Sequence, residues 1–115
     1  MELQFNETEH GIRHLKPIGT LDIMGVNEIE TKFTGYCAGE APQVVVDLSG
    51  VGFLASIGIR LLMLTAKAVQ SRGGRVVLAA PIEEVRNVLE ITGIPNVIPL
   101  FPSLAAAEQS LRASA

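Results

Sequence analysis

The sequence predicts an α/β fold in which a mixed sheet of four to five strands packs against about four helices. Two segments, QVVVDLS (43–49) and RVVLAA (75–80), are runs of apolar and mostly β-branched residues. Such runs are typical of strands that are buried on both faces of a parallel sheet. Between them, residues 57–72 carry apolar side chains at helical spacing. A strand, a helix and a strand with short connections form a βαβ unit, whose crossover is expected to be right-handed.

The first part of the chain predicts two antiparallel strands. Leu3 and Phe5 alternate with polar neighbours, as in a short half-buried strand. The pair His10-Gly11 then predicts a turn into a second strand over about 12–18. Pro17 interrupts this second strand, because proline can donate no hydrogen bond to a neighbouring strand.

Two helices are predicted from apolar spacing, over 27–37 and over 57–72. The first has three apolar residues at helical spacing, Val26, Ile29 and Phe33. In the second, one face is expected to be buried and carries Ile57, Leu61, Leu64 and Ala68. The opposite face is expected to be solvated and carries Arg60, Lys67 and Ser71. Gly73-Gly74 ends this helix, since glycine adopts the left-handed conformation that helix ends favour.

The last third of the chain predicts two more helices and a short edge strand. One helix is marked by three apolar residues and ends at Gly93, its apolar residues being Ile82, Val85 and Leu89. Asn96 to Ile98 predicts the edge strand. Ser103 is expected to cap the last helix, whose apolar side carries Leu104 and Leu111.

Composition and charge limit the classes of function. The chain has 115 residues, of which 48% are hydrophobic and 18% charged, so residues 1–115 are expected to form one globular domain. A formal net charge of −3 argues against direct nucleic-acid binding. No apolar run approaches the roughly 18 residues of a membrane span, and the segment MELQFNETEH lacks the apolar core of a signal peptide. We therefore expect a cytoplasmic protein with no membrane insertion.

The sequence predicts neither a metal site nor a bound cofactor. Cys37 is the only cysteine, which favours a buried or half-buried structural thiol. His10 and His14 flank a glycine turn rather than share a helix face, so both are interpreted as surface residues and not as metal ligands. The sequence contains no glycine-rich phosphate-binding loop.

Ser56 stands where an apolar segment becomes the helix over 57–72. A hydrolase nucleophile elbow, G-x-S-x-G, would need glycine where this chain has Leu54, and no histidine follows Ser56 in the chain. We therefore expect no enzymatic activity. Local physics alone favours a helix cap, in which the Ser56 hydroxyl accepts a hydrogen bond from a free backbone N–H and contributes about 1 kcal/mol.

Several short motifs occur along the chain, and their order and spacing are more specific than any one of them. Gly19-Thr20-Leu21-Asp22 precedes the first helix, and Asp47-Leu48-Ser49 ends a buried strand. The segment FLASIG (53–58) follows, then a helix, a Gly-Gly turn and a second buried strand, and finally VLEITGI (88–94). From about Ile12 to Leu111 the chain resembles the STAS domain, the fold of bacterial anti-sigma factor antagonists. The resemblance implies a single STAS-like domain.

The resemblance also implies a function. In this family the serine aligned with Ser56 is phosphorylated by a partner that is both an anti-sigma factor and a serine kinase of the histidine-kinase-like ATPase type. The unmodified form binds that partner, and a serine phosphatase restores it after phosphorylation. The residues implied in partner binding are Asp22, Ala55, Ser56, Ile57, Gly58 and Arg60.

Two residues of the motif depart from the family pattern F-x-D-S-[ST]-G. Ala55 replaces the acidic residue, and Ile57 replaces the second serine or threonine. These departures slightly favour a constitutive STAS scaffold, for example the small subunit of a lipid-transport ABC complex that docks on an ATPase. A third class is a domain that binds a small ligand or a nucleotide. Asp22 has two interpretations of equal weight, a partner contact and a cap for the helix that follows.

Overall fold

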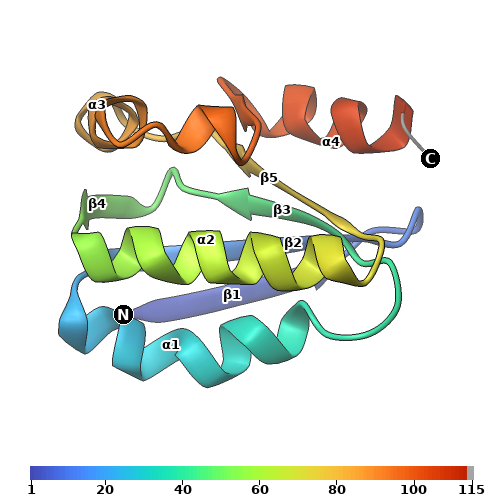
Figure 1. Ribbon diagram of the computed structural model, residues 1–115, viewed down its shortest axis with the longest axis horizontal. Helices are drawn as coiled ribbons and strands as arrows, with labels where there is room; N and C mark the ends of the chain where they lie inside the picture. The colour runs from blue at the N-terminus through green and yellow to red at the C-terminus, as the bar shows by residue number, and fades with distance from the viewer. Residues whose placement is uncertain (114–115) are drawn as a thin grey trace.

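The computed structural model describes residues 1–113 and contains one sheet with helices on both faces (Figure 1). The strands are β1 (Glu2–Glu7), β2 (Ile12–Leu21), β3 (Gln43–Asp47), β4 (Val51–Leu54), β5 (Arg75–Ala79) and β6 (Leu100–Phe101). The helices are α1 (Ile23–Tyr36), α2 (Ser56–Ser71), α3 (Glu83–Ile91) and α4 (Leu104–Ala113). A short 3-10 helix, η1 (Ile94–Asn96), follows α3.

The sheet is mixed, as predicted. Its order is β1-β2-β3-β5-β6, with β1 and β2 antiparallel and the other pairs parallel, and β4 pairs with β2 outside this path. The described residues thus form six strands instead of the predicted four to five. The additional strand is β4, a four-residue segment without alternating burial, since Gly52 and Phe53 in its middle are both exposed. Such a short segment has no periodic signal that distinguishes it from a loop.

Strand β2 divides its pairing between two parallel neighbours. Residues Ile12 to Leu15 pair with β3, whereas residues Gly19 to Leu21 pair with β4. Pro17 lies between these two stretches and is paired with neither β3 nor β4. Its missing backbone N–H therefore costs no hydrogen bond to either parallel neighbour. This explains why β2 extends through Pro17 to Leu21, beyond the predicted end at residue 18.

The buried strands separate two apolar layers. Val44 and Val46 of β3 face one layer, which contains side chains of α1, α2 and α3, and Val45 faces the other layer, which contains Ala107 and Leu111 of α4. Figure 1 shows α1 and α2 together on one side and α4 on the opposite side. Burial of β3 and β5 on both faces confirms the parallel core that the valine runs predicted.

The predicted buried face of the helix over 57–72 is partly wrong. The buried side chains of α2 include Leu61, Leu62, Ala66 and Val69, whereas Leu64 is 53% exposed and Ala68 is also exposed. Residues Ile57 to Leu64 are apolar at almost every position, so more than one face satisfies helical spacing. Packing against the sheet selects one of these faces and leaves an apolar face beside α1 uncovered.

Gly73, Gly93 and Ser103 lie at helix ends, as predicted. Gly73 and Gly93 have φ of 80° and 78°, the left-handed conformation. Ser103 caps α4, since its Oγ accepts a hydrogen bond from the N–H of Ala106 at 3.1 Å.

The strand predicted at residues 96–98 is wrong, because Pro95 lies in the first turn of η1. The edge strand forms four residues later, as β6.

Candidate functional site

Ser56 is the first residue of α2 and is exposed. The strands β2 and β4 lie parallel, with Leu21 opposite Leu54. The residues that follow each strand are therefore neighbours, and the N–H of Ala55 donates to the carbonyl oxygen of Leu21 at 3.0 Å. This places Asp22, which precedes α1, beside the Ala55-Ser56 segment, which precedes α2.

Two glycines allow the first turns of α1 and α2 to approach the end of β2. A Cβ on Gly25 would lie 1.9 Å from the carbonyl oxygen of Thr20. A Cβ on Gly58 would lie 2.8 Å from the carbonyl oxygen of Leu21. Both distances are far below van der Waals contact, so no side chain fits at either position. Gly58, for which the family resemblance implied a role in partner binding, is buried and shapes this site from within.

Asp22 caps α1. Its Oδ1 accepts a hydrogen bond from the N–H of Gly25 at 2.8 Å, and its backbone is extended, as at a helix N-cap. The side chain is half-buried. The structure therefore confirms the capping interpretation of Asp22, which also explains why α1 begins at Ile23, four residues before the predicted start.

Ser56 does not cap α2, so the prediction from local physics is wrong. Ala55 occupies the N-cap position, with φ −93° and ψ 170°, and has no side-chain acceptor to offer. No acidic residue lies in the first turn of α2. The positive end of this helix dipole is therefore balanced neither by a capping side chain nor by a nearby carboxylate of its own turn.

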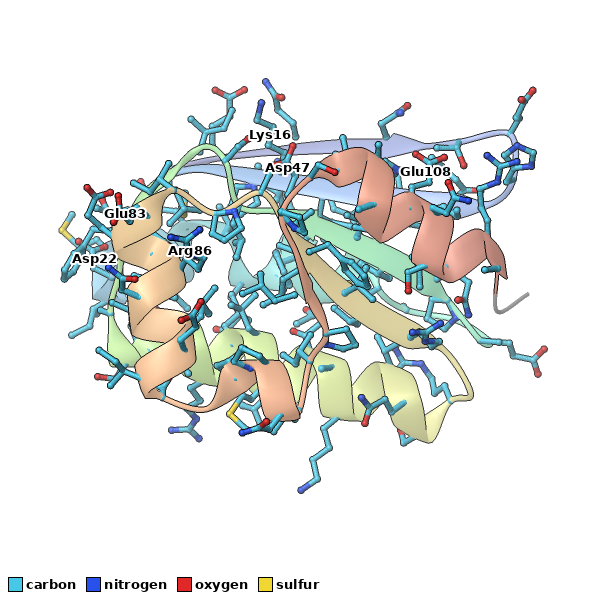
Figure 2. All side chains as sticks on the ribbon, turned by 90° about the horizontal axis from the view of Figure 1, so that it is seen from above. Lys16, Asp22, Asp47, Glu83, Arg86 and Glu108 are labelled. Carbon is cyan, nitrogen blue, oxygen red and sulfur yellow. The ribbon has the colours of Figure 1, made fainter. Side chains whose placement is uncertain are left out.

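Exposed apolar side chains surround this end of the sheet. Met24 at the start of α1 is 74% exposed, and Phe53 of β4 is 55% exposed. Ile23 and Ile82, just before α3, are exposed as well. Figure 1 shows that α1, α2, β4 and α3 meet at one end of the molecule, and Figure 2 labels Asp22 and Glu83 at that same end. We call the surface formed by Ile23, Met24, Phe53 and Ser56 the Ser56 face.

The other implicated residues lie next to this face. Ile57 is half-buried and packs against the core, and Arg60 is exposed one turn farther along α2. Sequence reasoning missed Ile23, Met24 and Phe53. The sequence signal for Ile23 and Met24 was their position directly after the Asp22 cap. Side chains in the first turn of a helix have little core to contact, so two apolar residues there indicate an exposed apolar surface.

The remaining candidate groups lie elsewhere. Cys37 is buried as predicted, and burial raises the pKa of its thiol to about 11 against the weaker opposing effects of Arg13 and Arg72. His10 is exposed, as predicted, but the prediction that His14 is a surface residue is wrong, because His14 is half-buried. The His14 Nε2 lies 3.6 Å from Glu108 Oε2. Among residues 1–113, no group of three His, Cys, Asp or Glu side chains could hold a metal ion. No described helix is long and apolar enough to cross a membrane.

Comparisons with known proteins agree with this architecture. A family model described as "STAS domain" matches residues 6–107. BtrV of Bordetella bronchiseptica, named as a candidate anti-sigma factor antagonist, is 27% identical over 94 residues, which cover 82% of this chain and 81% of that protein. An anti-sigma factor antagonist from Mycobacterium paratuberculosis has a TM-score of 0.82 at 27% identity, covering 96% of this chain and 93% of that one.

A third relative has been solved in two chemical states. The unphosphorylated form of the anti-sigma factor antagonist SpoIIAA has a TM-score of 0.78 at 19% identity, covering 97% of both chains. The phosphorylated form, described as a Bacillus cell fate determinant, has a TM-score of 0.69 at 18% identity, covering 95% of this chain and 99% of that one. At these identities the similarity shows the shared fold.

Proposed function

This chain belongs to the STAS domain family, and we propose that it acts as an anti-sigma factor antagonist, a protein that works by binding and not by catalysis. The observation that carries the proposal is the Ser56 face. It combines an exposed hydroxyl at an uncapped helix end with the exposed apolar side chains of Met24 and Phe53. Exposed apolar groups that cluster around a polar centre are typical of a protein–protein interface.

Phosphorylation of Ser56 would control this binding. A phosphate adds about −1.5 to −2 charges at neutral pH. The N–H groups of the first turn of α2 and the positive end of its dipole favour such a charge. Arg60, one helical turn beyond Ser56, adds a positive charge nearby. The domain is therefore expected to keep its fold when modified, while a partner surface packed around a small hydroxyl would have to bury an extra dianion.

The proposed partners are an anti-sigma factor that is also a serine kinase of the histidine-kinase-like ATPase type, and a serine phosphatase. The kinase would transfer the γ-phosphoryl group of ATP to Ser56 Oγ, with release of ADP and the hydroxyl proton. The phosphatase would return the serine by hydrolysis to inorganic phosphate. The names of the similar proteins support an anti-sigma factor as the partner, and the two solved states of SpoIIAA support phosphorylation of a domain with this fold.

Ala55 and Ile57 favour a second candidate function. Neither side chain can take part in phosphate transfer as an acid, a base or a hydroxyl acceptor. A constitutive scaffold that docks on an ATPase, as in a lipid-transport ABC complex, would need the apolar Ser56 face but no modification. The two functions differ in whether Ser56 ever carries a phosphate.

The test is to incubate the protein with ATP and each candidate ATP-binding kinase from its source, then to map the phosphate by mass spectrometry. We expect a single phosphate on Ser56 and none in Ser56→Ala. Ser49, Ser71 and Ser103 serve as internal controls. Ser71 is the strongest of them, because it lies at the carboxyl end of α2, where the helix dipole disfavours a phosphate. Modification of one of these three with Ser56 unmodified would contradict the switch.

A further inference from the structure

Strand β1 is one edge of the sheet, and its outer side has no neighbouring strand among the described residues. The N–H of Thr8 donates to the carbonyl oxygen of Ile12 at 2.9 Å, so these two residues form a hydrogen-bonded pair where β1 turns into β2. Such pairs alternate with non-hydrogen-bonded pairs along antiparallel strands. The backbone N–H and C=O groups of Leu3, Phe5 and Glu7 therefore point away from β2, towards the open edge.

These outward groups are accessible and unprotected. No hydrogen bond within residues 1–113 reaches them, and every residue of β1 except the half-buried Leu3 is exposed. The pairing with β2 continues without a bulge from Glu2 to Glu7, and the strand contains neither lysine nor proline. Bulges, lysines and prolines are devices that commonly keep an edge strand from pairing with another chain. The only charges on β1 are the glutamates at its two ends, so its centre is free to pair with a further strand.

We propose that a second copy of this chain pairs with this edge, and that the two β1 strands join antiparallel about a two-fold axis at Phe5. In this register Phe5 faces Phe5 of the second copy, and Leu3 faces Glu7 of the second copy. All outward N–H and C=O groups of both strands then form hydrogen bonds. An axis at Gln4 is less favourable, because Glu7 would then face a residue that lies outside β1.

The side chains on both faces of the sheet match in this register. On the face opposite α1, Gln4 meets Asn6 of the second copy, and Glu2 meets Thr8 of the second copy. On the α1 face, the ring of Phe5 is 38% exposed and meets the same ring of the second copy. Like charges directly opposite each other would destabilise the pairing, and this register contains none.

Helix α1 places a positive charge beside the same edge. The Glu28 Oε1 accepts a hydrogen bond from the Met1 ammonium at 2.7 Å, and the ring of Tyr36 stacks on that of Phe5 with 4.1 Å between their centroids. Lys32 lies one helical turn from both Glu28 and Tyr36, on the same side of α1. This side of α1 follows β1 from residue 1 to residue 5, so Lys32 lies beside the middle of that stretch. Lys32 is exposed and has no ion pair among the described residues.

In the two-fold arrangement Lys32 meets an opposite charge. Leu3 is the middle residue of the stretch beside Lys32, and it faces Glu7 of the second copy. The side chains of Leu3 and Glu7 are on the α1 face of β1, so the Glu7 carboxylate of each copy approaches Lys32 of the other. Helix α1 contacts both β1 and β2, which places its axis between these strands. With strands about 4.8 Å apart, the two α1 axes are about 10 Å apart, the usual distance between packed helices.

The dimer has one continuous sheet and leaves both Ser56 faces free. Strand β2 runs antiparallel to β1 and ends at the Ser56 face. The two-fold axis reverses the strand direction, so the two Ser56 faces lie at opposite ends of the dimer. One dimer can thus hold two partner molecules, and its formation does not depend on what binds the Ser56 face.

The test is sedimentation velocity of the full chain over about a hundredfold range of concentration, combined with amide hydrogen exchange followed by NMR. We expect the mass of one chain at the low end and of two chains at the high end. In the dimer, exchange should slow at the outward amides of Leu3, Phe5 and Glu7. A monomer at every concentration would overturn the proposal, as would a dimer whose outward β1 amides exchange as fast as in the monomer.

Two substitutions at Phe5 test the register. Phe5→Lys and Phe5→Glu each place like charges on the two-fold axis, and each alone should raise the Kd of the dimer at least about tenfold. An equal mixture of the two variants should recover the dimer, because lysine and glutamate then face each other. Both variants should fold, since the ring is already 38% exposed, and thermal unfolding checks this. Wild-type dimerisation of either variant alone, or a mixture that stays monomeric, would contradict pairing at Phe5.

Lys32→Glu and Glu7→Lys test the charged contact in the same way. Each alone should weaken the dimer about threefold to tenfold, and their equal mixture should restore it, because both Lys32–Glu7 contacts regain opposite charges. Lys67→Glu is the control, at an exposed position of α2 away from β1, and should dimerise as wild type does. An equal effect of Lys67→Glu would contradict the contact. Protection of the β1 amides by the anti-sigma partner in a monomeric protein would assign the edge to that partner and overturn the dimer.

Discussion

The N–H of Ala55 and the carbonyl oxygen of Leu21 form a 3.0 Å hydrogen bond that joins the segment before α2 to the end of β2. Asp22 and Ser56 each follow one partner of this bond directly. Their relative position is therefore fixed by the sheet and not by flexible loops. A partner that contacted both residues would therefore meet a preformed surface.

An acidic residue at position 56 should weaken partner binding and leave the fold intact. In Ser56→Asp and Ser56→Glu, a carboxylate at the uncapped end of α2 is well placed, so the free energy of unfolding should change by no more than about 1 kcal/mol. In a complex, the same charge would be buried without a partner, which should weaken affinity about a hundredfold or more. Calorimetric titration and thermal unfolding of each variant measure both effects.

Ser56→Ala is the control for this pair. It should bind the partner as wild type does but escape regulation, because no hydroxyl remains to accept a phosphate. If the two acidic variants bind as tightly as wild type, the switch is wrong and the constitutive scaffold is favoured.

Restoring a side-chain cap to α2 should stabilise the protein. Ala55 already has the extended backbone of an N-cap but lacks an acceptor, so Ala55→Ser or Ala55→Asp should raise the free energy of unfolding by about 1 kcal/mol. Ala55→Val adds bulk without an acceptor and should bring no such gain. Denaturant unfolding of the three variants checks this, and equal stability of Ser and Val variants would argue against a free helix end.

The close packing at Gly58 should make this position intolerant of any side chain. In Gly58→Ala, the new Cβ would lie 2.7 Å from Leu54 Cδ1 and 2.8 Å from the Leu21 carbonyl oxygen. We expect a loss of about 1–3 kcal/mol, the usual penalty of overpacking. Gly35 in α1 is the matched control, since a Cβ added there would meet only open space. Gly35→Ala should instead stabilise by roughly 0.5–1 kcal/mol.

The two roles of Asp22 can be separated by one pair of substitutions. Asp22→Ala removes the acceptor for the Gly25 N–H and should cost about 0.5–2 kcal/mol of stability. Asp22→Asn keeps the acceptor but loses the charge, so its stability should stay within a few tenths of a kcal/mol of wild type, as asparagine caps equally well. Unfolding curves test the cap. A loss of partner affinity in the asparagine variant, whose stability is unchanged, would reveal a partner contact that needs the charge.

The Cys37 thiol should make stability depend on alkaline pH. In the unfolded chain the thiol ionises near its ordinary pKa of 9.0, and in the folded protein burial raises the pKa to about 11. Between these values the unfolded state releases a proton that the folded state retains. This thiol should therefore leave the free energy of unfolding unaffected well below pH 9, lower it by up to about 1.4 kcal/mol per pH unit between pH 9 and about 11, and add no further pH dependence above that, where the folded thiol ionises too. Cys37→Ala, which lacks this ionisation, isolates the effect in parallel unfolding measurements.

The predictable parts of this fold are those in which local chemistry and burial agree. The segments 43–49 and 75–80 each contain short runs of consecutive apolar, mostly β-branched residues, as a strand buried on both faces requires, and both form central strands. Gly73 and Gly93 end their helices because other residues rarely adopt that backbone conformation.

The unpredicted parts depend on neighbours that are distant in sequence. Leu64 has the same apolar character as Leu61, and only the positions of α1 and the sheet decide which of them is buried. Either Ala55 or Ser56 could be the N-cap of α2. The backbone hydrogen bond from Ala55 to Leu21 fixes Ala55 in this position, although its side chain has no acceptor. At the candidate site, the motif indicated the position of Ser56 but not the apolar side chains around it.

The divided pairing of β2 sets an order of events during synthesis of the chain. The hairpin of β1 and β2 is local and can form on its own, but the last residues of β2 have no parallel neighbour until residues 51–54 have left the ribosome. Contacts between segments that are distant in sequence form more slowly than local ones. Until then the end of β2, with Ile23 and Met24 beyond it, stays unpaired with β4 in the nascent chain and is open to contact with a chaperone.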